Sequence, residues 1–301
     1  MAAPDVLQRL RLPVFGAPMF IVSGLELVIA QCRAGVLGAF PALNARPAEQ
    51  LDEWLWRLRE SLSEADAPYA VNLIVHGTNK RLEQDLALVV KHKAPVVITS
   101  LGARREVCEA VHSYGGLVFH DVTTTAFAHK AVEKGADGLV LVAAGAGGHG
   151  GRVSPFALVQ ETRAWFSGPI ALAGAIAHGR SIRAARVMGA DFAYIGTPFI
   201  AAAEANASAE YKEEVLASFS SDIVYTDLFS GILGNYLAGS IKRAGYDPDN
   251  LPPRLGAVDV DNGVKVWRDI WAAGQGVGGV RELETAAAMT ARWMREYEAA
   301  R

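Results

Sequence analysis

One histidine stands within a run of small residues, and this run is the part of the sequence best suited to chemistry. His149 follows Gly145-Ala146-Gly147-Gly148 and precedes Gly150-Gly151. Glycines let a backbone approach a flat ligand closely, and an imidazole has a pKa that suits proton transfer near neutral pH. We therefore predict that His149 is a catalytic base rather than a histidine of a solvated loop.

A second group of small residues indicates a phosphate-binding site. Gly174 and Ala175 follow one predicted strand, and Gly196 and Thr197 follow the next. Backbone N–H groups at a turn from strand to helix attract an anion, and small residues keep side chains out of its way. One such glycine could simply serve the turn, but two neighbouring strand ends favour a bound phosphate.

Few other reactive side chains stand at the predicted strand ends. The absence of a lysine there argues against Schiff-base chemistry, and the absence of a carboxylate pair argues against glycoside hydrolysis. His120, Asp121 and His149 could form a metal triad of two histidines and a carboxylate. Consecutive strand residues point to opposite faces, however. We predict no metal site, and a bound cofactor that supplies the chemistry.

Eight short apolar runs alternate with amphipathic segments and would position these residues. Strands that are apolar on both faces and separated by helices lie parallel, and eight such units close into a TIM barrel. We predict an α/β fold, a TIM (β/α)8 barrel over residues 1–200. The runs are 14–20, 36–42, 69–75, 96–100, 117–122, 138–145, 169–174 and 192–196.

Beyond residue 200 the alternation stops, and we predict a mainly helical C-terminal addition over residues 201–301. A helix is expected over 204–220, irregular structure over 222–261 and a last helix over 280–299. The segment 225–237 is expected to form a roof over the substrate. Exposed Trp and Leu side chains on the last helix would allow a homodimer.

The amino-acid composition limits the kinds of partner and the cellular location that we expect. The 301 residues are 51% hydrophobic and carry a net charge of −3, which provides no basic field for nucleic acid or an anionic membrane. No stretch of about twenty apolar residues would span a bilayer. Cys32 and Cys108 stand far apart, so they offer no disulfide framework and no zinc site. We expect a cytoplasmic protein with a small-molecule substrate.

The motifs, in this order and spacing, resemble the nitronate monooxygenase family. Its members, formerly called 2-nitropropane dioxygenases, are FMN-dependent TIM-barrel enzymes related to the FabK-type enoyl reductases. The resemblance spans most of the chain. It rests on Ala17-Pro18-Met19, Asn72, Gly147-Gly148-His149-Gly150, Ala173-Gly174-Ala175-Ile176-Ala177, Gly196-Thr197 with Phe199, and Gly274-Gln275-Gly276.

The resemblance implies FMN as the cofactor and His149 as the catalytic residue. His149 would take the α-proton of a neutral nitroalkane or hold the nitronate anion, while the flavin passes an electron toward O2, giving a carbonyl compound and nitrite. Gly145 departs from the family, which often has Glu there. The implied FMN contacts are Ala17, Met19, Asn72, Ser100, Gly148, Gly174, Ala175, Gly196, Thr197, Gln275 and Gly276.

Other functions fit the same motifs. The flavin cradle and glycine-rich run would equally serve an FMN-dependent NAD(P)H oxidoreductase that acts on a quinone or an enoyl compound. A barrel without flavin could bind a phosphorylated metabolite, or use His120 and His149 as a metal-dependent lyase. Bleaching of a flavin by NADH or NADPH would favour the reductase, and absence of flavin would favour the last two.

Overall fold

The computed structural model describes residues 5–253 and 266–300, and its centre is a barrel of eight parallel strands. The strands follow one another around the barrel as β1-β9-β8-β6-β5-β4-β3-β2, and a bridge between Phe15 and Leu37 closes the ring. Each predicted apolar run contains one strand, so the TIM barrel is confirmed. The strands are β1 (Val14–Gly16), β2 (Gly38–Pro41), β3 (Tyr69–Ile74), β4 (Val96–Ser100), β5 (Leu117–Val122), β6 (Gly138–Val142), β8 (Ile170–Ala173) and β9 (Phe192–Ile195).

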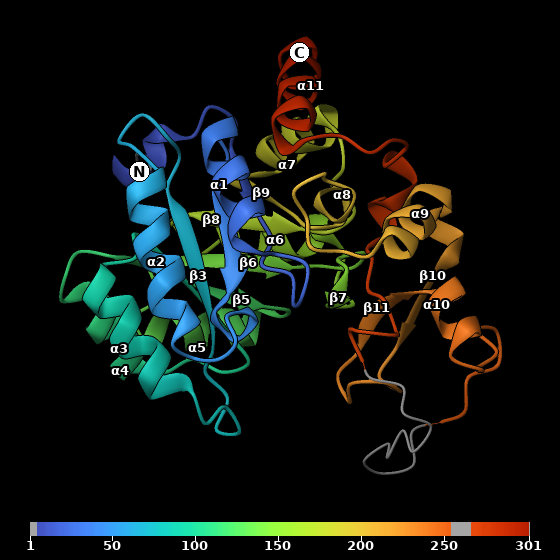
Figure 1. Cartoon of the computed structure of the whole chain (residues 1–301), viewed down its shortest axis with the longest axis horizontal. Coiled ribbons are helices and arrows are strands. Elements are labelled where there is room, and N and C mark those ends of the chain that lie inside the picture. Colours follow the sequence, from blue (N-terminus) through green and yellow to red (C-terminus); the bar gives the residue numbers. More distant parts are fainter. Residues whose placement is uncertain (1–4, 254–265, 301) are drawn as a thin grey trace.

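Helices cover the outside of the barrel (Figure 1). In α2 (Gln50–Ser61) Leu51, Leu55 and Leu58 are spaced to share one face and are fully buried, whereas Trp56 points to solvent. The other helices around the barrel also bury residues, and in the short α8 (Thr197–Ile200) all four residues are buried. They are α1 (Leu25–Ala34), α3 (Leu82–His92), α4 (Arg105–His112), α5 (Thr125–Glu133), α6 (Pro155–Arg163), α7 (Gly179–Met188) and α8 (Thr197–Ile200).

Aromatic rings fill the inside of the barrel. Phe15 stacks on Phe192 at 4.6 Å and meets Phe119 edge-on at 5.2 Å, measured between ring centroids. Leu7 of the 3-10 helix η1 (Asp5–Arg9) packs into the same buried cluster. The barrel is therefore a packed core, and space for a ligand lies beyond the strand ends.

The C-terminal addition lies beside the barrel and contains a sheet as well as helices (Figure 1). Strands β10 (Ile223–Thr226) and β11 (Gly234–Leu237) pair antiparallel, and β11 also pairs with β7 (Gly148–His149). The helix predicted over 204–220 is shorter in the structure, where it spans Ala209–Ala217. The segment 222–261, which was predicted to be irregular, contains this hairpin. Residues 254–261 of that segment lie outside the described chain. The remaining elements are η2 (Ala42–Asn44), α9 (Ala209–Ala217), η3 (Ser220–Asp222), α10 (Ala238–Arg243), η4 (Gln275–Gly279) and α11 (Ala286–Ala299).

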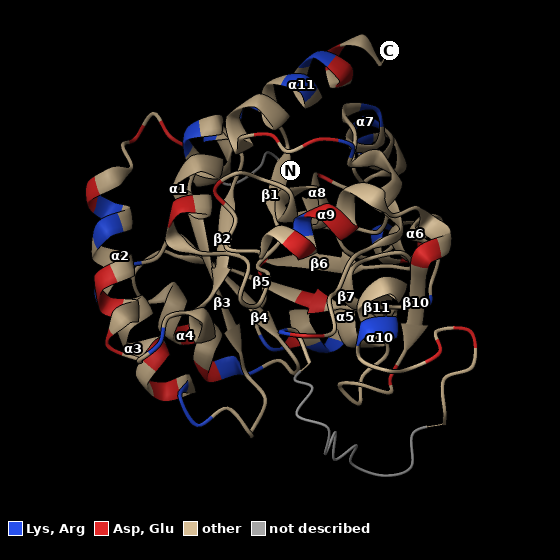
Figure 2. Cartoon of the chain, turned by 45° about the vertical axis from the view of Figure 1, so that its right-hand side comes forward, with Lys and Arg blue, Asp and Glu red and all other residues tan. Residues whose placement is uncertain are grey.

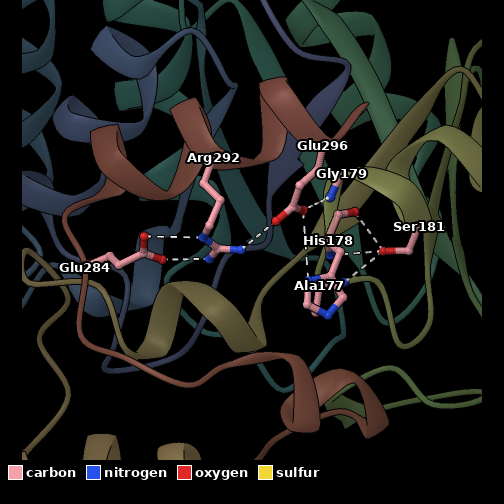
Figure 3. Close-up of polar contacts among 7 residues, drawn as sticks. All are labelled: Ala177, His178, Gly179, Ser181, Glu284, Arg292 and Glu296. Carbon is pink, nitrogen blue, oxygen red and sulfur yellow. Dashed lines mark hydrogen bonds and ion pairs between the residues drawn. The ribbon is translucent and has the colours of Figure 1, made fainter. Parts of the chain in front are cut away.

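The last helix, α11, is fastened to the N-terminus of α7 (Figure 3). Glu296 accepts a hydrogen bond of 2.7 Å from the backbone N–H of Gly179, and Arg292 bridges Glu296 to Glu284. Trp293 is completely buried and meets Phe199 edge-on. The expectation of an exposed Trp on this helix is therefore wrong, because the residue joins the core. Leu283, which is exposed, precedes the helix.

Replacing Glu296 by Ala is expected to loosen this attachment. The variant loses the carboxylate that caps α7, and a lost cap costs about 1 kcal/mol, or about 2–4 °C in the melting temperature Tm of a chain this large. Differential scanning fluorimetry measures the change. Glu298→Ala is the matched control because Glu298 is an exposed residue of the same helix. Equal Tm values for the two variants would contradict the role of Glu296.

Charged residues lie mainly on the outer helices and loops (Figure 2). Both signs are mixed along these helices, and the barrel strands are nearly free of charge. Across residues 5–253 and 266–300, no helix is long and apolar enough to cross a membrane.

Candidate active site

A cavity of about 1200 Å³ lies at the carboxyl ends of the barrel strands and is covered by the addition. Gln275 is the one predicted site residue that does not line it: Gln275 is exposed, and its backbone N–H donates to the carbonyl of Gly145 at 2.9 Å. The structure brings the other predicted residues together around one space. They are Ala17, Met19, Asn72, Ser100, Gly148, His149, Gly174, Ala175, Gly196, Thr197 and Gly276.

The loops after β8 and β9 form a concave cradle of backbone. Gly174 and Ala175 have φ angles of +145° and +55°, an uncommon pair that turns the chain sharply. The N–H groups of Ala175, Ile176 and Gly196 have no hydrogen-bond partner in the described chain. A Cβ on Gly174 would come within 2.8 Å of the Ala144 carbonyl oxygen, so only glycine fits there. Free N–H groups in a concave turn are suited to a phosphate.

The glycine-rich tail before α11 packs directly on the backbone of two cavity loops. The N–H of Gly274 donates to the Thr197 hydroxyl at 2.9 Å. A Cβ on Gly274 would lie 2.5 Å from the Gly145 carbonyl oxygen, and one on Gly276 would lie 2.9 Å from the carbonyl carbon of Ala175. Positions 274 and 276 therefore need glycine because their backbone packs closely against the loops that line the cavity.

The addition fixes the backbone on either side of His149. Through the pairing of β7 with β11, Gly234 lies opposite His149. Asn235 donates to the Ala146 carbonyl at 2.6 Å, and the Tyr225 hydroxyl donates to the Gly150 carbonyl at 2.8 Å. The ring of His149 meets Trp267 edge-on at 5.2 Å. The backbone of the glycine-rich run is therefore held in place on both sides of His149.

The electrostatic setting of His149 favours its neutral form. Burial lowers the pKa of His149 to about 4, because the surroundings solvate an imidazolium poorly. A neutral imidazole can accept a proton at neutral pH. The arrangement is therefore suited to a base more than to a permanent cation.

The cavity floor carries a chain of polar side chains. Asn72 donates to the Ser100 hydroxyl at 2.8 Å, and Ser100 donates to Oδ2 of Asp121 at 2.6 Å. Oδ1 of Asp121 is shielded from solvent and has no partner in the described chain. Burial raises the pKa of Asp121 to about 7, so this carboxyl group holds a proton far above the usual pH range.

Tyr194 lies on the cavity floor and was not predicted from the sequence. It lines the cavity, its hydroxyl has no partner among the described residues, and burial together with Asp121 raises the pKa of its phenol. Strand alternation could have found it, because Tyr194 stands two residues before Gly196 and so shares its face. Trp267 also lines the cavity, but no sequence pattern places it there.

The alternative metal triad is not assembled in the part of the chain that the structure describes. His120 hydrogen-bonds the Thr99 hydroxyl at 2.7 Å, whereas Asp121 bonds Ser100 on the other face of the sheet. Within those residues, no three His, Cys, Asp or Glu side chains gather into a metal site. Burial also lowers the pKa of His120 to about 4.

Replacing Asp121 by Asn is expected to change how stability depends on pH. The folded protein keeps the Asp121 proton up to about pH 7, whereas the unfolded chain loses it near pH 4. The contribution of Asp121 to the free energy of unfolding therefore decreases as the pH rises from 4 to 7. At pH 8 the variant should melt at least about 4 °C higher than the parent, and the gap should shrink toward pH 4. Equal pH profiles of Tm would contradict the raised pKa.

Comparison with known proteins places this cavity in a family. The family model for nitronate monooxygenase matches residues 25–248, which include β2 to β11 and His149. The chain belongs to the nitronate monooxygenase family. It is accordingly an oxidoreductase, as the resemblance of its motifs implied.

Individual relatives agree with this assignment. The nitronate monooxygenase of Paraburkholderia phytofirmans is 25% identical over 299 residues, covering 83% of this chain and 80% of the relative. Two solved structures share the fold. Nitroalkane oxidase from Streptomyces ansochromogenes is 24% identical and superimposes with a TM-score of 0.82, covering 99% of each chain. FabK from Thermotoga maritima is 23% identical, with a TM-score of 0.81, and covers 98% of this chain and 95% of that one.

Proposed function

We propose that this member of the nitronate monooxygenase family is FMN-dependent and oxidises alkyl nitronates with O2 to a carbonyl compound and nitrite. One structural observation supports the proposal. A neutral histidine and a cradle of free backbone N–H groups line the same cavity. The Paraburkholderia relative is itself named a nitronate monooxygenase.

The residues present fit FMN. Small-molecule pockets commonly enclose about 300–1000 Å³, so a cavity of about 1200 Å³ accommodates a flavin together with a small organic substrate. The N–H groups of Ala175, Ile176 and Gly196 would hold the phosphate. Ala17 and Gly148 offer small surfaces for a flat ring. When bound, FMN takes up electrons from the substrate and passes them on to O2.

His149 would prepare a neutral nitroalkane for that chemistry. A ring nitrogen of the uncharged imidazole takes the proton from the carbon next to the nitro group, which leaves the nitronate in the cavity. A nitronate supplied as such needs no base. The two substrates therefore differ in their need for His149.

Turnover in air tests this proposal. Purified protein reconstituted with FMN is mixed with a primary alkyl nitronate, and O2 uptake and nitrite are measured together. We expect both, without added NADH or NADPH. Absence of nitrite from both the nitronate and the parent nitroalkane would contradict the proposal.

A reductase is the second candidate, and the cavity mouth favours it. Lys130 and Arg152 line the cavity and form no ion pair with another described residue. Phe127, which also lines the cavity, is exposed, and Nζ of Lys130 lies 6.0 Å from the centre of its ring. Such a mouth suits a larger substrate with an anionic group, as an FMN-dependent NAD(P)H:quinone or enoyl reductase could use. Rapid anaerobic oxidation of NADH or NADPH by the FMN-loaded protein would favour this function.

A further inference from the structure

The hydroxyl of Ser230 joins His149 to a buried tyrosine. Ser230 lies in the connection between β10 and β11, where its Oγ is 2.9 Å from Nε2 of His149 and 3.0 Å from the hydroxyl of Tyr236. It also donates to the Ile232 carbonyl at 3.0 Å and accepts from the Ile232 backbone N–H at 3.4 Å. Neither Ser230 nor Tyr236 belongs to the motifs that carry the family resemblance.

The protons on these groups can be assigned from what each can donate. Ser230 is the sole hydrogen-bond partner of the Tyr236 hydroxyl among the described residues, and burial raises the pKa of Tyr236, so the phenol stays protonated and donates. A carbonyl can only accept, so the single proton of Ser230 goes to Ile232. The Ser230 oxygen then accepts from the Tyr236 hydroxyl at 3.0 Å and from Nε2 of His149 at 2.9 Å, both shorter than its 3.4 Å contact with the Ile232 N–H. The geometry therefore favours a proton on Nε2.

The packing holds this arrangement in place. Tyr236 is fully buried, and its ring lies 5.7 Å from the Trp267 ring that also contacts His149. Trp267 has a φ of +71°, which is uncommon for a bulky residue and persists only where its surroundings hold it. Nδ1 of His149 has no partner in the described chain. The imidazole is thus fixed through one nitrogen while the other is free.

We propose that Ser230 and Tyr236 are positioning residues that hold His149 in the Nε2–H tautomer and leave Nδ1 as the atom that takes the substrate proton. In the balanced step, the carbon–hydrogen bond next to the nitro group breaks, the proton forms a bond to Nδ1, and the electron pair stays on the nitronate. This role rests on the proposed use of His149 as a base.

Nitrogen-15 NMR of labelled, FMN-loaded protein tests the tautomer without any turnover. Comparison with His149→Asn identifies the His149 signals. We expect a protonated Nε2 and an unprotonated Nδ1 at pH 7, and loss of this single tautomer in Ser230→Ala. A protonated Nδ1 in the parent protein would overturn the proposal, because Ser230 would then donate to His149.

Kinetics with two substrates separate positioning from a merely structural role. In Ser230→Ala, kcat/KM for a neutral nitroalkane should fall about fivefold, the change that corresponds to the roughly 1 kcal/mol contributed by one hydrogen bond. For the preformed nitronate it should stay within about twofold, because that substrate needs no base. Tyr236→Phe should show the same selectivity with a smaller loss.

Thr226→Ala is the matched control. Its hydroxyl accepts from the backbone N–H of Leu228 in the same hairpin, without touching His149, so both substrates should react normally. Equal losses for both substrates in Ser230→Ala would overturn the positioning role. If the parent protein oxidises neither substrate, the proposed function fails, and the NMR result still decides the tautomer.

Discussion

Replacing His149 by Asn is expected to lower kcat/KM for a neutral nitroalkane by about 10²- to 10⁴-fold, the usual contribution of a general base. The amide cannot accept the proton that the neutral imidazole takes. Because burial lowers the pKa of His149 to about 4, the parent activity should be independent of His149 titration from about pH 6 upward. Initial rates of nitrite release at several pH values measure both effects.

The nitronate is the internal control for this substitution. It already lacks the α-proton, so His149→Asn should oxidise it at nearly the parent rate and retain the same FMN content. Unchanged turnover of the neutral nitroalkane would show that His149 is not the base. If the rates for both substrates and the FMN content all fall in this variant, His149 would instead contribute to cofactor binding.

Replacing Gly274 by Ala is expected to destabilise the protein and release FMN. The added Cβ would lie 2.5 Å from the Gly145 carbonyl oxygen and 2.8 Å from the backbone nitrogen of Gly147. Both are backbone atoms of the loop that leads to His149, so the steric clash can be relieved only if the loop moves. Overpacking of this kind commonly costs about 1–3 kcal/mol, and we expect a Tm lower by about 4 °C or more.

Gly77→Ala provides the control for the second substitution. A Cβ on Gly77 meets no heavy atom within 4 Å, and the φ of Gly274 is −90°, an angle that alanine also adopts. A difference between the two variants therefore reports the steric contact. Thermal melting and the FMN retained after gel filtration measure it. The same Tm and FMN content for both would contradict the close approach of the tail.

The barrel was predictable because its signals are local. Each buried strand is a continuous apolar run, and the parallel arrangement follows from the helices between strands. The cradle was predictable for the same reason, since Gly174 and Gly196 directly follow strands. His149 stood out as an ionisable group among glycines. These residues occupy positions that chain order alone places at one end of a barrel.

The remaining site residues depend on contacts between distant parts of the chain. Ser230 reaches His149 across 81 positions, and Gly274 reaches Thr197 across 77. Neither hydrophobic periodicity nor motif spacing in the sequence indicates which distant residues form such pairs. Trp293 was expected on the surface of an amphipathic helix, but the docking of α11 buries it against Phe199. Gln275 stands in a recognised motif, yet only the fold shows that its backbone N–H bonds to the loop that leads to His149.

The proposed FMN-dependent oxidation of nitronates is tested most directly by the absorption spectrum of the protein, first reconstituted with FMN and then mixed anaerobically with an alkyl nitronate. We expect one bound flavin per chain, a visible spectrum that changes on addition of the nitronate, and little change with NADH or NADPH. A protein that retains no FMN after reconstitution, or a flavin that only NADH or NADPH reduces, would contradict it.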